Sequence, residues 1–301
     1  MRRRFLREME EADAADDRED TLFGAEASGP PMPAGLDRHA DRLARLKACR
    51  EKLEAQAGEA AARQQEKIAA REAEEQATGK RKRGRKPAAP DPEVDPEAVA
   101  NPTDPDSGIM KTRRGWVQGY NAQAVVTPDQ IILAADVTTD ANDVGQLTGM
   151  LDQAQAGIGI IMGEDAVLGA VVADAGYWSE ANAASQTEEC DLFIATRKDH
   201  KQRADLRDAP PPRGRMPKQM TARERMDRKL RTKRGRALYR QRGAAVEPVF
   251  GQMKDRHGAD RFSMRGLERC QGEWQLDAAV HNLRKLHRES VRSAKNAGNT
   301  G

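Results

Sequence analysis

Two stretches of this sequence decide its fold, Val167–Tyr177 (VLGAVVADAGY) and Tyr239–Lys254 (YRQRGAAVEPVFGQMK). The first stretch is a short, continuous apolar run that ends in a carboxylate, Asp174. Runs of this kind are typical of strands buried on both faces of a sheet. In the second stretch Glu247 precedes Pro248, and these two residues predict a helix that begins at the proline.

The residues before the apolar run predict a β-hairpin and a helix. Residues 116–126 and 131–137 are strand-like, and residues 127–130 (TPDQ) have Pro and Asp where a type I turn favours them. Residues 143–157 carry apolar side chains at helical spacing. After the run, we expect a helix over 179–189 and a second short buried strand over 192–195.

The basic segment 197–235 is interpreted as an extended or partly helical insertion. A last helix is expected over about 266–290. Its apolar face consists of Leu276, Ala279, Val280, Leu283 and Leu286. This alternation of elements predicts an α/β domain.

The N-terminal part of the chain has a different texture. Residues 36–77 are rich in Ala, Glu, Arg and Lys and predict a long helix. Leucines at coiled-coil spacing in its first half fit either dimerisation, hence a homo-oligomer, or a solvated spacer. We expect four segments: a charged helical region (1–78), a basic, Pro-rich disordered linker (79–110), the α/β domain (111–292) and a flexible tail (293–301).

Composition narrows the class of protein. Of 301 residues, 33% are charged and 4% are aromatic, which is too polar for one compact core over the whole length. The three cysteines form no metal-ligand or disulfide pattern. The sequence has neither an apolar run of transmembrane length nor the apolar region of a signal peptide, so we expect a soluble cytoplasmic protein with no membrane partner.

The two acidic residues suggest metal chemistry, although each has a simpler interpretation. Ligands of open α/β sheets gather at the carboxyl ends of strands, where Asp174 is expected, but Asp is also a common helix cap. Glu247 is either a helix-start residue or a metal ligand beside a phosphate backbone, and the nearby cations Arg242 and Lys254 favour the second interpretation. Two such carboxylates can share divalent ions next to a phosphodiester.

These motifs resemble bacterial insertion-sequence DDE transposases of the IS4-like superfamily. The resemblance rests on VVADAGY, on the Tyr-Arg…Glu…Lys block, on residues 265–286, and on GYNAQAV and TTDAND in the predicted hairpin region. It implies an RNase H-like mixed sheet flanked by helices, which binds Mg²⁺ (or Mn²⁺) through Asp, Asp and Glu. It also implies cleavage of transposon ends and strand transfer to target DNA.

The resemblance assigns roles to individual residues. Asp174 matches the second acid and Glu247 the third, both catalytic and metal-binding, while Tyr239, Arg242 and Lys254 match the family's DNA-binding signature. Arg242 lies five residues before Glu247, where many relatives have four, whereas the spacing from Glu247 to Lys254 is the same as in the family.

No segment of the sequence matches the family's first acid. We therefore expect an N-terminally truncated transposase that is inactive alone, unless Asp136, Asp140 or Asp143 substitutes; Asp136 is the best candidate from sequence. The alternatives are a non-catalytic DNA-binding regulator derived from a transposase and an unrelated metal-dependent nuclease. In the linker, Arg83 and Arg85 are expected to bind DNA, either as a minor-groove hook or through phosphates; a solvated linker is the simpler interpretation.

Overall fold

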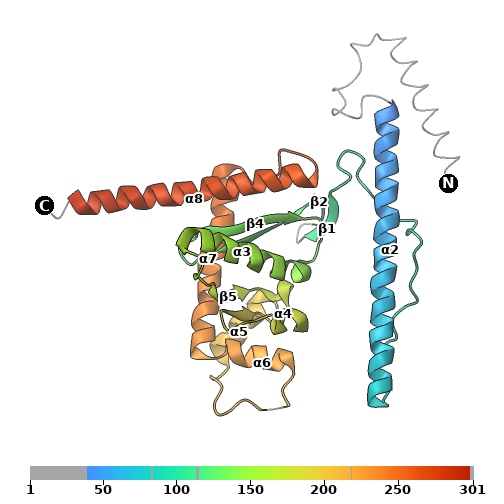
Figure 1. Cartoon of the computed structure of the whole chain (residues 1–301), viewed down its shortest axis with the longest axis horizontal. Coiled ribbons are helices and arrows are strands. Elements are labelled where there is room, and N and C mark those ends of the chain that lie inside the picture. The colour runs from blue at the N-terminus through green and yellow to red at the C-terminus, as the bar shows by residue number, and fades with distance from the viewer. Residues whose placement is uncertain (1–38, 83, 113–114, 218, 299–301) are drawn as a thin grey trace, which may run out of the picture. The chain divides into compact units, whose positions relative to one another are not determined.

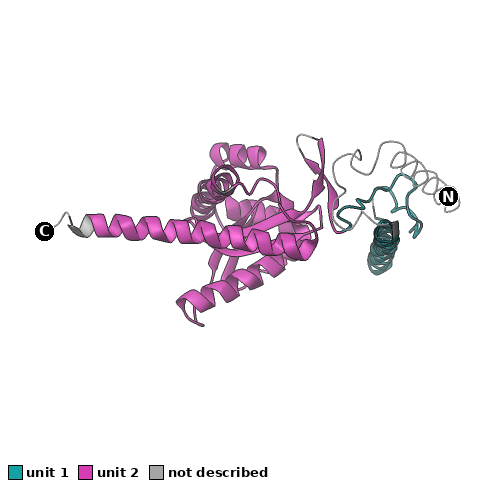
Figure 2. Cartoon of the chain, turned by 90° about the horizontal axis from the view of Figure 1, so that it is seen from above, with its two compact units in different colours: residues 1–105 teal, residues 106–301 magenta. Residues whose placement is uncertain are grey.

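A computed structural model describes residues 39–298, except 83, 113–114 and 218. The chain divides into two compact units, residues 1–105 and 106–301, which Figure 2 distinguishes by colour. Residues 1–38 of the predicted charged helical region lie outside the described residues. No helix in the described part of the chain is both long and apolar enough to cross a membrane.

The first unit contains the long helix α2, His39–Thr78, as predicted. The segment after it runs back along α2 in the opposite direction. Arg71 donates to the carbonyls of Lys82 and Arg85, Gln64 reaches Ala88, and Arg45 reaches Thr103. The described residues between α2 and β1 form no helix or strand, but these contacts give the basic segment a definite path.

The second unit begins with two antiparallel hairpins. They pair β1 with β2 and β3 with β4: Gly108–Thr112, Gly115–Gly119, Asn121–Val126 and Ile132–Thr138. The predicted turn and returning strand are confirmed in the β3–β4 hairpin, but the predicted first strand, 116–126, is divided between β2 and β3. Its turn is closed by a hydrogen bond of 2.9 Å from Gln130 N to Thr127 O, and Gln130 itself has a φ of 67°. A type I turn followed by such a left-handed residue is a common hairpin connection.

A parallel pair of strands follows the hairpins. β5 (Gly169–Ala173) and β6 (Cys190–Ile194) lie where the sequence predicts buried strands. Before β5 the chain forms the short 3-10 helix η2 (Asp143–Gln146) and α3 (Leu147–Met162), which confirm the predicted helix over 143–157. The remaining elements before α7 are η3 (Ala175–Tyr177), α4 (Glu180–Ala184), α5 (Asp199–Asp208) and α6 (Ala222–Leu230).

The prediction that a helix begins at Pro248 is wrong. Helix α7 runs without a break over Lys233–His257, with Pro248 inside it. A proline inside a helix leaves the carbonyl four residues earlier without its usual partner. Here that carbonyl belongs to Ala244, and the side chain of Gln130 donates to it at 3.2 Å. Glu247 therefore lies in the middle of a 25-residue helix rather than at its start.

The last helix, α8 (Leu267–Gly298), lies along β4 (Figure 1) and extends past Ser293, where the tail was expected to begin. Its buried face is not the one that the leucines mark. Cys270, Trp274, Ala278 and His281 are buried, whereas Leu276, Leu283 and Leu286 are exposed, Leu283 by 66%. Packing against β4 selects the face with the indole, whose Nε1 donates to Gln123 O at 2.8 Å.

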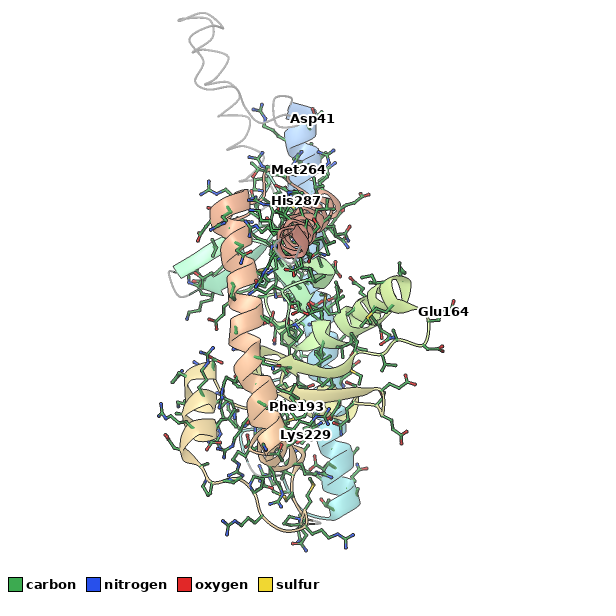
Figure 3. All side chains as sticks on the ribbon, turned by 90° about the vertical axis from the view of Figure 1, so that its left-hand side faces the viewer. Asp41, Glu164, Phe193, Lys229, Met264 and His287 are labelled. Carbon is green, nitrogen blue, oxygen red and sulfur yellow. The ribbon has the colours of Figure 1, made fainter. Side chains whose placement is uncertain are left out.

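Two main apolar clusters form the core, and α7 contributes to both. The first lies around β5 and β6 and includes Leu192, Ile194 and Tyr239. At its edge, Lys229 Nζ lies 4.6 Å from the ring centroid of Phe193 (Figure 3). The second lies around β4, α8 and the C-terminal half of α7, with Val249 and Trp274. The N-terminal half of α7 thus belongs to one cluster and its C-terminal half to the other.

The α/β class is confirmed, but the described strands pair in three separate two-stranded sheets rather than in one mixed sheet. β3 and β5 do not pair with each other. The RNase H-like arrangement and the four segment boundaries stay predictions.

Candidate functional site

Asp174 directly follows β5, at the carboxyl end of the parallel pair, as predicted. It caps η3, since its Oδ1 accepts a hydrogen bond of 2.7 Å from Gly176 N. The interpretation of Asp174 as a cap is therefore confirmed. This contact fixes the position of the carboxylate at the strand end.

A second carboxylate lies beside Asp174, and it is Asp143. A Cβ atom on Gly176 would stand 2.6 Å from Asp143 Oδ2 and 3.0 Å from Asp174 Oδ1, so both carboxylates approach this glycine. Asp143 Oδ1 accepts hydrogen bonds from Asn121 at 2.7 Å and from Gln123 at 2.9 Å. Burial raises the pKa of the neighbouring Tyr177 hydroxyl, and the negative charges of Asp143 and Asp174 raise it further.

The expectation that Asp136 is the best substitute for the missing acid is not supported by these contacts. Asp136 binds Gln153 and Gln271, at 3.0 and 2.8 Å, and Asp140 accepts from Gln146. The choice of Asp136 rested on its position on the returning strand. The neighbour of Asp174 comes instead from η2, which sequence spacing alone does not place.

Tyr239 and Arg242 converge on Asp199, at the start of α5. The Tyr239 hydroxyl donates to Asp199 Oδ1 at 2.9 Å, and Arg242 Nη2 donates to the same oxygen at 2.6 Å. Burial would raise the pKa of Asp199, but these two hydrogen bonds and the positive charges of Arg242 and Arg203 together hold the pKa below its usual range. Tyr239 is only 3% exposed, so its hydroxyl serves this contact inside the domain.

Glu247 belongs to the same network through Arg203. Arg203 Nη2 lies 2.8 Å from Glu247 Oε1, and Arg203 Nε lies 2.8 Å from Asp199 Oδ2. The Glu247 side chain is 64% exposed. Sequence reasoning missed Asp199 and Arg203; the position of Asp199 just after a predicted strand was the signal that could have pointed to it.

Three further residues are predicted to bind DNA, namely Lys254, Arg85 and Arg83. Lys254 is exposed on α7, seven residues after Glu247. Arg85 is exposed in the first unit, where its backbone carbonyl accepts from Arg71. Arg83 lies outside the described residues.

A cavity of about 500 Å³ adjoins Asp174. β3 and β5 line two of its sides, and α3 and α7 contribute the others. Its polar lining includes Asn121, Gln123, Asp143, Asp174, Tyr177 and Arg242. The rest of its lining is largely apolar, and Val125, Leu151 and Val172 are examples.

The donor set fits a divalent cation in part. Asp174 and Asp143 offer carboxylate oxygens of the kind that Mg²⁺ and Mn²⁺ prefer. Glu247 is occupied by Arg203 instead. Within the described residues, no group of three or more His, Cys, Asp or Glu side chains is arranged to hold a metal ion.

Comparison with protein-family models matches residues 211–287 to the transposase DDE domain. The match includes α6, α7 and most of α8, and therefore Tyr239, Arg242, Glu247 and Lys254. Searches of curated proteins and of solved structures found no match. The segment with the Tyr-Arg…Glu…Lys block is therefore related to DDE transposases, and the chain carries a transposase DDE domain sequence over residues 211–287.

Proposed function

We propose that this chain is the catalytic part of a transposase, which binds DNA and uses Mg²⁺ or Mn²⁺ to cleave and transfer strands at insertion-sequence ends. The observation that carries the proposal is the match of residues 211–287 to the transposase DDE domain, combined with Asp174 at the end of β5. Asp174 and Glu247 are the proposed second and third acids of the site.

The exposed face of α7 supports a DNA-binding role. Arg240, Glu247 and Lys254 follow one another at intervals of seven residues and are all exposed. Because α7 is continuous through Pro248, these side chains share one face and succeed one another every 10 Å or so. Two cations flanking an acid in this way fit a DNA backbone on either side of a metal ligand.

In the proposed site, Asp174 and Asp143 would hold the cation. A bound Mg²⁺ would act as a Lewis acid on a phosphodiester oxygen. Arg203 holds Glu247 by an ion pair, so Glu247 would have to leave this pair before it could bind the cation. We propose that the site lacks the family's first acid and that the chain is inactive alone.

The alternative is a non-catalytic DNA-binding regulator derived from a transposase. The ion pair between Arg203 and Glu247 favours it, because this contact neutralises the carboxylate that catalysis needs. A regulator would keep the cations of α7 and of the linker and would not bind the metal through Glu247.

The test uses the full chain and a DNA fragment that contains its coding region with both flanks. We expect salt-sensitive binding and no cleavage with Mg²⁺ or Mn²⁺. Manganese binding that is lost in both Asp174→Ala and Glu247→Ala supports the catalytic proposal, and DNA binding without manganese binding supports the regulator. Absence of DNA binding at low salt contradicts both, and cleavage abolished by Asp143→Ala contradicts the missing acid.

A further inference from the structure

The cavity beside Asp174 lies between two strand edges. All six residues of β3, Asn121–Val126, line it, as do four consecutive residues of β5, 170–173. Side chains alternate between the faces of a sheet, so consecutive residues can all line one cavity only along the edge of a strand. Among the described strands, β3 pairs with β4 alone and β5 with β6 alone. The cavity therefore adjoins the second edge of each strand.

Helices α3 and α7 also line the cavity, as helices cover the faces of an inner strand. α3 contributes Leu147, Met150, Leu151 and Ile158, and α7 contributes Leu238, Gln241, Arg242, Ala245, Val246 and Phe250. Helices from two separate parts of the chain thus line a space bordered by two strand edges. A space of this kind has the environment of a strand buried on both faces.

The sequence of β5 also indicates that a neighbouring strand belongs on its second edge. Its apolar run is typical of an inner strand, yet Ala170, Val171 and Val172 are only half-buried. The composition of β5 therefore fits a strand with neighbours on both edges.

The polar lining of the cavity includes a hydrogen-bond donor without an acceptor. Arg242 Nε is buried and has no hydrogen-bond partner in the described part of the chain, although Arg242 Nη2 binds Asp199. A buried donor without a partner costs free energy. A carbonyl oxygen that entered the cavity beside Arg242 would satisfy this donor.

We propose that this cavity binds an extended, apolar peptide strand of five or six residues supplied by a separate polypeptide. The strand would pair with β3 on one edge and with β5 on the other, and so join two of the two-stranded sheets. It would bring a backbone carbonyl to Arg242 Nε. This inference rests on geometry and holds whether or not the chain acts on DNA.

The two borders fix the direction of the strand. The first residues of β3 lie at the carboxyl end of β5, because Asp143 binds Asn121 and Gln123 and lies beside Gly176. The last residues of β3 lie toward the start of β5, because Val125 and Leu168 pack in the same apolar cluster. β3 and β5 therefore run in opposite directions. A strand antiparallel to β3 and parallel to β5 continues the pairing that each sheet already has, with its carboxyl end beside Asp174.

The probe is a panel of fluorescein-labelled eight-residue peptides, each with five inner Val, Ile or Ala residues and lysines at the ends. Binding to the full chain is followed by fluorescence anisotropy, and protection is followed by hydrogen exchange of residues 121–126 and 169–173. We expect saturable binding of at least one peptide and slower exchange in both segments. Protection of only one segment, or no binding by any peptide at millimolar concentration, overturns the proposal.

Two controls make the test specific. N-methylation of alternate amides removes the donors on one edge of the peptide, and the complementary set removes those on the other; each set should weaken binding about 10-fold or more. Equal binding of either methylated peptide contradicts a strand with two paired edges. Ala245→Phe fills the cavity and should abolish binding, while Ala279→Phe on the exposed face of α8 should not. Should Ala245→Phe fail to fold, the methylated peptides decide.

Discussion

Gln130 donates a hydrogen bond from its side-chain amide to the carbonyl of Ala244, the group that Pro248 leaves without a helical partner. The same glutamine accepts from Lys285 Nζ at 2.8 Å, and its backbone carbonyl contacts His281 Nε2 at 2.9 Å. A hairpin turn thereby holds both long C-terminal helices, and the interior proline of α7 is tolerated because of it.

Gln130→Ala should lower the free energy of unfolding by about 1 kcal/mol, because the exposed carbonyl of Ala244 loses its protein donor. Pro248→Ala restores an N–H to that carbonyl. In the Pro248→Ala background, Gln130→Ala should therefore cost less, and urea unfolding of the four proteins in this cycle measures the difference. Strictly additive effects would show that the two residues are not coupled.

Asp199→Asn should destabilise the protein at neutral pH by about 1 kcal/mol, since it removes the charge that pairs with Arg242 and Arg203 at a partly exposed site. The pKa of Asp199 is lowered in the folded state. Its contribution is thus present above the unfolded value of about 3.9 and is lost as the pH falls through the folded value. Urea unfolding of both proteins between neutral and acidic pH checks this, and a gap that widens on acidification would contradict it.

Asp143→Asn should weaken Mn²⁺ binding by about 10-fold or more, as Asp174→Asn should, because both carboxylates lie at the proposed cation position. Asp136→Asn is the matched control, since Asp136 binds Gln153 and Gln271 instead. Electron spin resonance of free Mn²⁺ measures the affinity. An equal loss in Asp136→Asn would mean that the substitutions act through the fold.

Gly235→Ala should destabilise the protein by about 2 kcal/mol, because the added Cβ would meet backbone atoms of Lys229 and Leu230 at 2.4–2.8 Å. Gly251 lies in the same helix and has open space around it. Gly251→Ala should therefore stabilise the protein by about 0.5–1 kcal/mol. Thermal unfolding of both variants tests the pair, and a shift of the same sign in both would be inconsistent with this packing.

Replacing Arg83 and Arg85 with Ala should make the salt dependence of DNA binding shallower. Each lost phosphate contact reduces the slope of log K against log salt by about 0.9. Arg50→Ala with Arg63→Ala, exposed cations on α2, is the control. Equal slopes for all three proteins would favour a solvated linker, and a preference for A·T-rich over G·C-rich duplexes that only the linker variant loses would favour minor-groove contacts.

Most helices and strands were predictable, because the patterns that indicate them lie in short stretches of neighbouring residues. The hairpin at 121–138, both parallel strands and α8 follow such patterns. The predictions that failed depended on contacts between residues far apart in the sequence. In sequence, Pro248 predicts a helix start, because the contact between Gln130 and Ala244 is not visible there. The buried face of α8 depends on packing against β4 rather than on its leucines.

The candidate site divides in the same way. The position of Asp174 at a strand end follows from one stretch of sequence. The neighbours that define its chemistry do not, since Asp143 comes from a 3-10 helix and Arg203 reaches Glu247 across 44 residues. Contacts of this range depend on how elements pack, and no local spacing encodes them.

One half of α7 packs in each of the two apolar clusters, so this helix connects them. In a continuous sheet, backbone hydrogen bonds would make the two clusters open together. Here each cluster has its own pair of strands, so each can open as a local unit with its own free energy. The amides of β5 and β6 should accordingly exchange at a rate different from those of β3 and β4, and a strand bound between them would bring the two rates together.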